Sequence, residues 1–154
     1  MRVGFTGTRK GMTAAQKLRL DTELAPLFDG PVLHEFHHGD CVGADSQAVD
    51  MVRAFYPGVA IHRHPPVNPT SRANNWNPTH DHTSHPPAQY LDRNRDIVES
   101  CDVLLAAPAE GPEMEAFRRG GTWSTVRRAR GRVLVITVFP DGSREQCPAN
   151  GGAA

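Results

Sequence analysis

The chain has 154 residues, and its 17 lysine and arginine residues balance 17 aspartate and glutamate residues, so the formal net charge at pH 7 is zero. A neutral chain does not coat DNA through a global excess of cations, because neutralising phosphates takes a surplus of lysine and arginine. Its 38% hydrophobic and 22% charged residues are typical of one folded domain, and no apolar run approaches the ~20 residues that span a bilayer.

Three cysteines, Cys41, Cys101 and Cys147, lie far apart, and none belongs to a CxxC motif. The first seven residues contain one arginine, glycines and polar groups rather than the continuous apolar segment of a signal peptide. We therefore predict reduced thiols in a cytoplasmic protein that has no membrane partner.

Strand and helix patterns alternate from the N-terminus. Val3 and Phe5 alternate with small or polar residues and predict a strand, which residues 6–11 interrupt. Thr13 and Gln16 have the spacing of a capping box, so we expect a helix to begin there. The expected apolar face of this helix consists of Leu20, Leu24, Leu27 and Phe28.

The next patterns predict a strand at residues 32–36, an amphipathic helix at 44–55 and a third strand at 59–61. Residues 65–89 contain six of the thirteen prolines and no apolar periodicity. We expect a long loop here, which either acts as a lid or stays disordered. Trp76, among polar residues of this loop, is a candidate for stacking on a base when a lid closes.

The second half predicts a helix at 91–100, a buried strand at 103–107, a helix at 122–130, a buried strand at 133–139 and a flexible tail at 141–154. Strands that alternate with helices and are apolar on both faces indicate a parallel sheet covered on both sides. The expected fold class is α/β, with one three-layer Rossmann-like domain at residues 1–140 and a parallel sheet of about five strands. Ligands of such domains bind at the carboxyl edge of the sheet.

Three glycine-containing segments lie at predicted strand-to-helix junctions, where each can cradle an anion. Glycine lets the backbone approach a phosphate, and free amides at a helix start point the positive end of the dipole at it. The candidate ligand-binding residues are Gly7, Thr8, Arg9, Gly39, Asp40, Gly43, Ala44, Asp45, Gly120, Gly121, Thr122, Ser124 and Thr125. Each segment alone is equally compatible with an ordinary turn, and Asp45 either binds a ribose hydroxyl or favours the first turn of its helix. Because neither GxGxxG nor GxxxxGKS/T occurs, dinucleotide and P-loop sites are disfavoured and we predict no cofactor.

Arginines are concentrated around the third segment, at positions 118, 119, 127, 128, 130 and 132. Arg118 and Arg119 precede the Gly-Gly turn, where guanidinium groups can reach a phosphate. The later arginines fit either a solvated helix face with favourable charge near the helix C-terminus or a nucleic-acid groove. The neutral net charge makes nucleic acid the less favoured partner.

Taken together, these segments resemble the SLOG superfamily of Rossmann-like nucleotide-binding proteins, which includes the DNA-processing protein DprA and the Lonely Guy (LOG) phosphoribohydrolases. The motifs that carry the resemblance are Gly7-Thr8-Arg9, residues 39–45, Leu91-Asp92-Arg93-Asn94, residues 101–108 and Gly121-Thr122. The resemblance covers about residues 2–139 outside the proline-rich loop. It implies a nucleotide-type small molecule as ligand and a homodimer or higher homo-oligomer.

LOG enzymes hydrolyse the N-glycosidic bond of nucleoside 5′-monophosphates. The resemblance assigns Arg93 and Asn94 to the family's arginine motif, Pro108 to the proline at the strand end and Gly121-Thr122 to the phosphate turn. It also puts Thr125 where the family has a glutamate.

This departure matters because glycosidic cleavage builds oxocarbenium character, which a carboxylate usually stabilises. We expect Glu115 to supply the carboxylate, with Arg93 as the other catalytic residue; Glu110 and Glu113 are further candidates, and all three fit solvent-exposed loop charges as well. Three functions therefore remain open: N-glycosidic hydrolysis, a nucleotide sensor or carrier without catalysis, and DprA-like nucleic-acid binding.

Eight histidines raise the question of a metal site. His62 and His64 lie on one face at the end of the third strand, and His80, His82 and His85 lie in the proline-rich loop. No HExxH motif or Cys/His zinc spacing is present, so we predict solvated loop histidines and no metal ion. Cys41, near His38 and Asp40, is either a nucleophile or a small residue that fits a turn.

Overall fold

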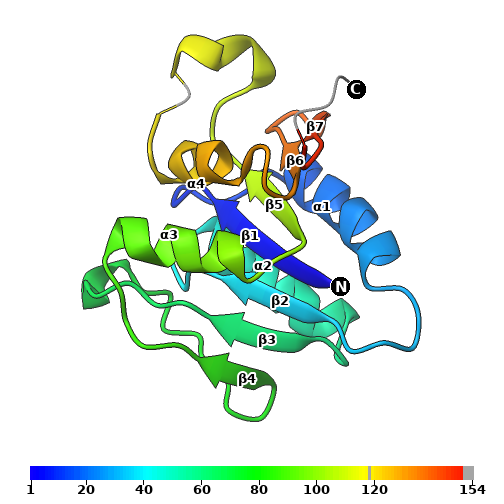
Figure 1. The fold of residues 1–154 in the computed structure, drawn as a ribbon, viewed down its shortest axis with the longest axis vertical. Helices are drawn as coiled ribbons and strands as arrows, with labels where there is room; N and C mark the ends of the chain where they lie inside the picture. The colour runs from blue at the N-terminus through cyan, green and yellow to red at the C-terminus, as the bar shows by residue number, and fades with distance from the viewer. Residues whose placement is uncertain (118, 151–154) are drawn as a thin grey trace.

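The chain folds into a seven-stranded sheet with a pair of helices on each side (Figure 1). The computed structural model describes residues 1–117 and 119–150, apart from the side chains of residues 115–117. The strands are β1 (Arg2–Gly7), β2 (Glu35–His38), β3 (Ala60–Arg63), β4 (Asp81–Ser84), β5 (Val103–Ala107), β6 (Leu134–Val138) and β7 (Arg144–Cys147). The helices are α1 (Ala14–Leu27), α2 (Ala44–Phe55), α3 (Tyr90–Glu99) and α4 (Gly121–Ala129), with short 3-10 turns at η1 (Pro69–Ser71) and η2 (Pro112–Phe117).

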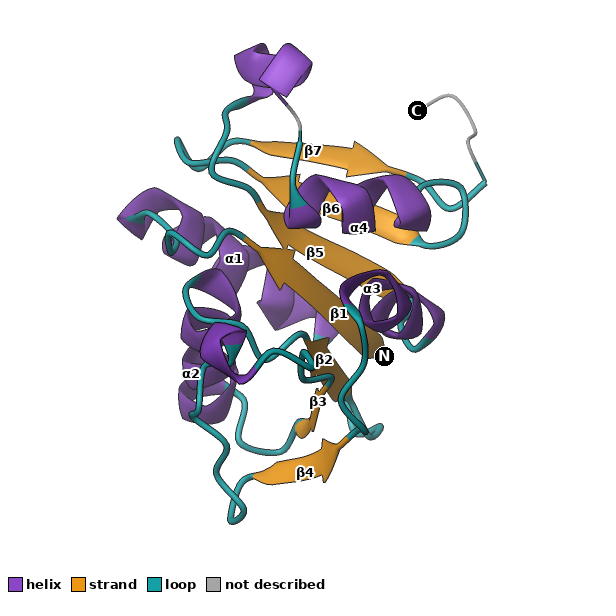
Figure 2. Ribbon diagram, turned by 90° about the vertical axis from the view of Figure 1, so that its left-hand side faces the viewer, coloured by secondary structure: helices purple, strands orange, loops and turns teal. Residues whose placement is uncertain are grey.

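The strand order is β4-β3-β2-β1-β5-β6-β7. The strands from β1 to β6 pair in parallel, and β7 pairs antiparallel with β6. Helices α1 and α2 lie on one side of the sheet and α3 and α4 on the other (Figure 2). The predicted three-layer α/β architecture is confirmed, although the sheet has seven strands instead of about five.

The two faces of the sheet have separate apolar cores. One contains Leu20, Leu24 and Val52 from α1 and α2 beside Phe5 and Phe36 from the strands. The other joins α3 and α4 to the opposite face of the sheet. Its members include Ile97, Val98, Leu104, Trp123, Val126 and Val135. Burying one such side chain contributes about 1.5–3 kcal/mol, so both helix pairs are firmly held against the sheet.

The start of α1 follows directly from the predicted capping box. The Thr13 hydroxyl accepts a hydrogen bond from the Gln16 amide, and the Gln16 side-chain oxygen accepts one from the Thr13 amide, both at 3.0 Å. The buried Gln16 side chain also donates to the carbonyl oxygens of Pro108 and Val138. This side chain therefore ties α1 to the ends of β5 and β6.

Three predicted segments need correction. The strand expected at 32–36 begins at Glu35, because Val32 and Leu33 are exposed. The loop expected at 65–89 contains η1 and the edge strand β4, which the ion pair of Arg53 with Asp81 fastens to α2. The tail expected from residue 141 contains β7, which is polar and gains its order from pairing with β6.

The chain reverses its direction across the sheet between β1 and β5. After β1 it crosses to β2 on one side, and after β4 it returns through α3 to β5 on the other side. The loops after β1 and β5 therefore diverge and leave a crevice, which is where open α/β sheets bind ligands. Among the residues that the structure describes, no helix is long and apolar enough to span a membrane.

Candidate functional site

A cavity of about 340 Å³ lies at the carboxyl ends of β1 and β5. Nine of the predicted site residues line it: Gly7, Thr8, Arg9, Asp45, Arg93, Asn94, Gly120, Gly121 and Thr122. They come from the loop after β1, the first turns of α2 and α3, and the start of α4. The structure therefore brings these residues from separate segments of the chain together around one cavity.

The loop after β1 forms one wall and is held by backbone hydrogen bonds. The Thr8 amide donates to the Ala107 carbonyl at the end of β5, and the Thr8 carbonyl accepts from the Ala44 amide at the start of α2, both at 2.9 Å. Gly43 has a φ of 88°, and a Cβ placed on it would overlap the carbonyl of Arg9. This close approach requires glycine at position 43 and fixes the wall of the cavity.

Arg93 is buried in the wall contributed by α3. Its Nη1 donates to the Gly39 carbonyl at 3.4 Å and to the Cys41 sulfur at 3.2 Å, and its guanidinium carbon lies 5.5 Å from the centre of the Tyr90 ring. Its Nε, and Nδ2 of the neighbouring Asn94, are buried donors without a partner among the described residues. Buried donors in proteins are normally satisfied, so these two nitrogens need acceptors that the described residues do not supply.

The N-terminus of α4 forms the wall opposite the β1 loop. Gly120 is the N-cap and supplies no side-chain cap, and the first turn contains no acidic residue. The first amides of α4 are therefore available to an anion, together with the positive end of the helix dipole. A Cβ at Gly121 would overlap the hydroxyl of Tyr90, so glycine is needed where α3 and α4 meet.

Among the described residues, cations outnumber acids around the cavity. Arg9, Lys10, Arg93 and Arg119 line it, against the carboxylates of Asp45 and Glu110. Such a lining favours a ligand of negative charge.

Burial changes the protonation of two groups in the cavity wall. Burial raises the pKa of Asp45 to about 6, although Arg93 and the amides of Cys41 and Gly39 stabilise the carboxylate. Burial also raises the pKa of the Cys41 thiol above its usual value. Since a thiolate is the reactive form, a neutral buried thiol argues against Cys41 as a nucleophile.

Glu110 is the cavity carboxylate nearest in sequence to the predicted acid. The buried indole of Trp123 donates from Nε1 to Glu110 Oε2 at 3.0 Å, which orients the carboxylate from α4. The side chain of Glu115, the predicted acid, lies outside the described residues.

The remaining predicted residues do not line the cavity: Gly39, Asp40, Gly43, Ala44, Pro108, Ser124 and Thr125. Asp40 is buried behind the loop and forms an ion pair with Arg63 at 3.5 Å. Thr125 is buried one turn into α4, and its hydroxyl donates back to the Gly121 carbonyl at 3.0 Å. Trp76 lies 4.5 Å from the Arg63 guanidinium, and none of residues 65–89, all of which are described, lines the cavity. In this structure the loop therefore lies apart from the cavity, and its role as a lid stays a prediction.

Several lining residues were absent from the predicted set, namely Thr6, Lys10, Tyr90, Ala109 and Arg119, although Arg119 had been noted as able to reach a phosphate. Tyr90 stands three residues before Arg93 on α3, a spacing that places both on one helix face. That spacing could have predicted Tyr90 as a site residue, whereas nothing in the sequence around Ala109 indicates a cavity wall.

Protein-family models, curated proteins and solved structures were compared with the chain, and none of them matches it. The site is therefore interpreted from its own chemistry. That chemistry consists of two unpartnered buried donors, an uncapped helix N-terminus and an excess of cations around one cavity.

Proposed function

We propose that the chain binds a nucleotide or nucleotide-derived phosphorylated ligand in the cavity between β1, β5 and α4. The observation that carries this proposal is the pair of buried donors, Arg93 Nε and Asn94 Nδ2, which lack a partner among the described residues and belong to cavity-lining side chains. A phosphate supplies several acceptor oxygens and the negative charge that an arginine and a helix N-terminus favour.

The cavity suits the other parts of a nucleotide as well. Its volume of about 340 Å³ falls within the range of small-molecule sites. Asp45 is ionised above its pKa of about 6 and can then accept hydrogen bonds from sugar hydroxyls. The Tyr90 ring offers an aromatic surface at the mouth. The SLOG resemblance of Gly7-Thr8-Arg9, Arg93-Asn94 and Gly121-Thr122 supports the same ligand class.

The proposal predicts that charge on the ligand decides binding. We expect nucleoside 5′-monophosphates to raise the Tm, whereas the corresponding nucleosides leave it unchanged, because they lack the group that Arg93 and α4 bind. The measurement is thermal unfolding with a panel of monophosphates, nucleosides and inorganic phosphate at fixed ionic strength.

A single-stranded oligonucleotide is the comparison that separates nucleic-acid binding from mononucleotide binding. Affinity for the oligonucleotide that falls steeply with salt, without any Tm shift from a mononucleotide, would favour the DprA-like alternative. Equal Tm shifts from nucleosides and monophosphates would contradict a phosphate site.

Hydrolysis of the N-glycosidic bond is a second candidate function, favoured by Glu110. This carboxylate lines the same cavity as Arg93 and is oriented by Trp123. A carboxylate beside the ribose can stabilise the oxocarbenium-like transition state or activate water. We therefore assign Glu110 to this reaction as the acid among the described side chains, and the expected role of Glu115 stays a prediction.

Glu110→Gln distinguishes catalysis from binding. If the chain hydrolyses nucleoside monophosphates, we expect this substitution to lower the rate of free-base release by about 100-fold or more, because a neutral amide does not stabilise positive charge on the ribose. The ligand-induced Tm shift is expected to persist. Base release is followed by chromatography.

Glu113→Gln is the matched control, since Glu113 lies in the same loop, is exposed and does not line the cavity. Base release that survives in Glu110→Gln, or that fails equally in Glu113→Gln, would remove Glu110 from the reaction. Binding without base release in the unmodified chain would select the sensor or carrier.

A further inference from the structure

Four histidines meet on the sheet face that carries α3, away from the cavity described above. Phe36 and Ile61 point into the α1–α2 core, so their strand neighbours His37 and His62 lie on the opposite face. His64 follows β3, and His85 follows β4. We call His37, His62, His64 and His85 the histidine cluster.

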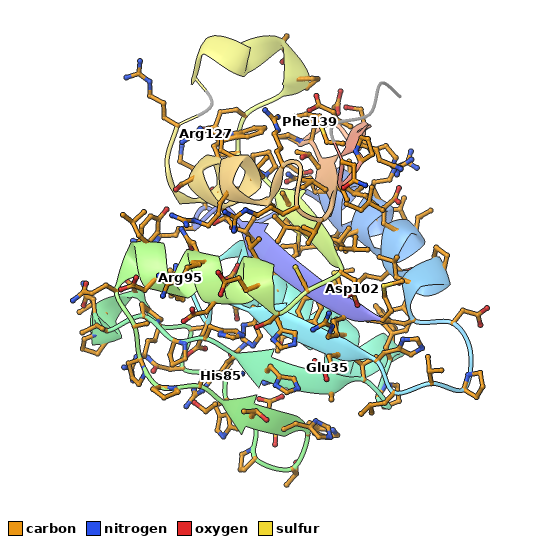
Figure 3. The ribbon with its side chains drawn as sticks, in the orientation of Figure 1. Glu35, His85, Arg95, Asp102, Arg127 and Phe139 are labelled. Atoms are coloured by element: carbon orange, nitrogen blue, oxygen red, sulfur yellow. The ribbon has the colours of Figure 1, made fainter. Side chains whose placement is uncertain are left out.

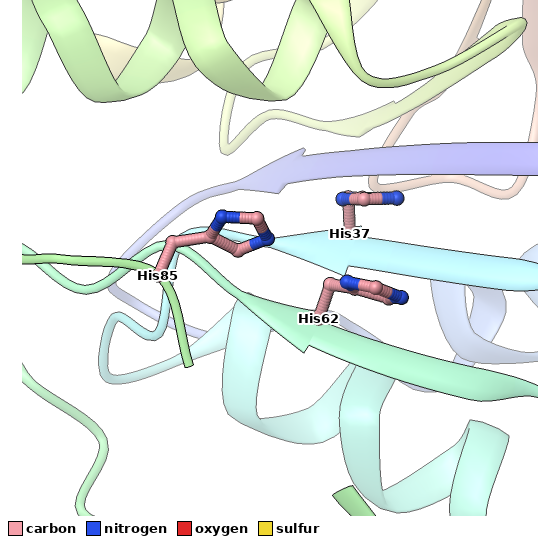
Figure 4. Close-up of side chains that lie close together, drawn as sticks. All are labelled: His37, His62 and His85. Carbon is pink, nitrogen blue, oxygen red and sulfur yellow. The ribbon is translucent and has the colours of Figure 1, made fainter. Parts of the chain in front are cut away.

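The rings of the cluster are stacked in two pairs. His37 and His62 have ring centres 4.5 Å apart, and His64 and His85 have ring centres 4.1 Å apart. Figure 4 shows the ring of His85 directing one nitrogen toward the rings of His37 and His62. One ring nitrogen of each of these three residues lies within 4.8 Å of the other two.

The hydrogen bonds leave two ring nitrogens of His37, His62 and His85 without a partner among the described residues, while His37 Nδ1 is paired with His64 Nε2 at 3.0 Å. His37 Nε2 lies 2.8 Å from a Glu35 carboxylate oxygen, which accepts, so this nitrogen carries the proton and Nδ1 has the lone pair. The other ring atoms in question, His62 Nδ1 and His85 Nε2, are buried and have no hydrogen-bond partner among the described residues. A cation that accepts lone pairs would satisfy His62 Nδ1 and His85 Nε2 and would take the place of the His64 hydrogen bond at His37 Nδ1.

We propose that the histidine cluster binds one divalent transition-metal ion of the zinc class, with His37, His62 and His85 as ligands. Neutral imidazole is the ligand that zinc, copper and nickel share, whereas magnesium and calcium require oxygen ligands. Two nitrogens bound to one zinc ion at about 2.0–2.1 Å stand roughly 3.4 Å apart, so small rotations of these side chains bring them into range.

Glu35 and His64 complete the surroundings of the proposed site. A carboxylate that accepts from the distal nitrogen of a histidine ligand fixes its tautomer and orientation, and Glu35 has this relation to His37. His64 Nε2 lies 3.0 Å from His37 Nδ1, close enough to serve as a fourth ligand when the ion binds.

A second cavity gives the ion a route of entry. It has a volume of about 400 Å³ and is lined by His64, His85, Asp96 and Glu99, together with Pro86, Pro87, Ala88 and Ser100. The carboxylates of α3 attract cations to its mouth. Figure 3 shows Glu35 and His85 on this side of the sheet, below α3.

The test measures metal binding by the untagged full chain. We expect about one Zn²⁺ per chain after dialysis, measured by elemental analysis. With Co²⁺ in place of Zn²⁺ we expect an absorption band in the visible region, typical of a Co²⁺ ion that has nitrogen ligands and a low coordination number. Zn²⁺ at a hundredfold excess over its Kd should raise the Tm by roughly 5 °C, whereas Mg²⁺ and Ca²⁺ should leave it unchanged.

His62→Ala and His85→Ala are the variants, and His80→Ala, at an exposed position of the same loop, is the matched control. His62→Ala and His85→Ala are each expected to lose the stoichiometric zinc and the Co²⁺ band. His80→Ala is expected to keep both. A folded His85→Ala that retains the band, or an unmodified chain with no band and no bound zinc, overturns the proposal. This test uses no nucleotide, so its result is independent of the function proposed for the first cavity.

Discussion

Arg93→Met is expected to weaken binding of a nucleoside monophosphate by about 100-fold or more. Arg93 is a buried cation of the cavity lining, and its Nε has no hydrogen-bond partner among the described residues. Truncating one partner of a buried charge pair costs about 2–5 kcal/mol, which corresponds to this loss of affinity. Methionine preserves most of the side-chain volume, so the packing against Tyr90 is largely retained. Isothermal titration calorimetry of both proteins measures the difference.

Arg95→Met is the matched control for Arg93→Met. Arg95 belongs to the same helix, and its half-exposed guanidinium forms surface ion pairs with Asp92 and Asp96 (Figure 3). We expect unchanged affinity in this variant, because exposed ion pairs contribute about 0–1 kcal/mol and these do not face the cavity. Equal affinities in the two variants would show that Arg93 does not contact the ligand. Arg93→Lys adds a second comparison, since lysine keeps the charge but lacks the planar fork.

Gly43→Ala is expected to destabilise the fold by about 4 kcal/mol or more and to lower the Tm by ~10 °C. Gly43 has a φ of 88° and a ψ of −126°, a backbone conformation that residues other than glycine rarely adopt. The new methyl group would also overlap the Arg9 carbonyl, and backbone atoms cannot rotate away. The β1 loop must then move from the start of α2, so ligand affinity should fall with stability. Thermal and urea unfolding measure the change.

Gly30→Ala separates the two causes of this loss. Gly30 has a φ of 91°, but a Cβ placed on it has nothing within 4 Å. This variant carries the conformational strain alone, and we expect a loss of about 1 kcal/mol. If Gly43→Ala is no less stable than Gly30→Ala, the close approach of the Arg9 carbonyl is not tight in solution.

Local sequence signals predicted the elements whose order comes from their own residues. The capping box of Thr13 and Gln16 placed the start of α1, and the continuous apolar run placed β5 at Val103–Ala107. The edge strands escaped this reasoning. Both β4 and β7 are polar, and their order depends on pairing with β3 and β6, a tertiary contribution that no short-range pattern reveals.

For the site, glycine and arginine spacings located the cavity because parallel strands gather their loops at one edge. Ser124 and Thr125 were predicted as members of the third glycine-containing segment, yet neither lines the cavity: Thr125 is buried, and its hydroxyl donates to the Gly121 carbonyl. The histidines were considered as a linear motif, whereas they meet across neighbouring strands. The alternation of side chains along β2 and β3 would have placed His37 and His62 on the same face of the sheet. The position of His85 depends on the pairing of β4 with β3.

The position of the first cavity also determines which parts of the molecule a bound ligand would stabilise. Its walls include Thr8, which is joined to α2 of one core, and Thr122, at the start of α4 in the other core. A molecule held by both would act as a cross-link between the two halves of the domain. Hydrogen-exchange protection on binding should therefore extend to both sides of the sheet rather than stay confined to the loops that touch the occupant.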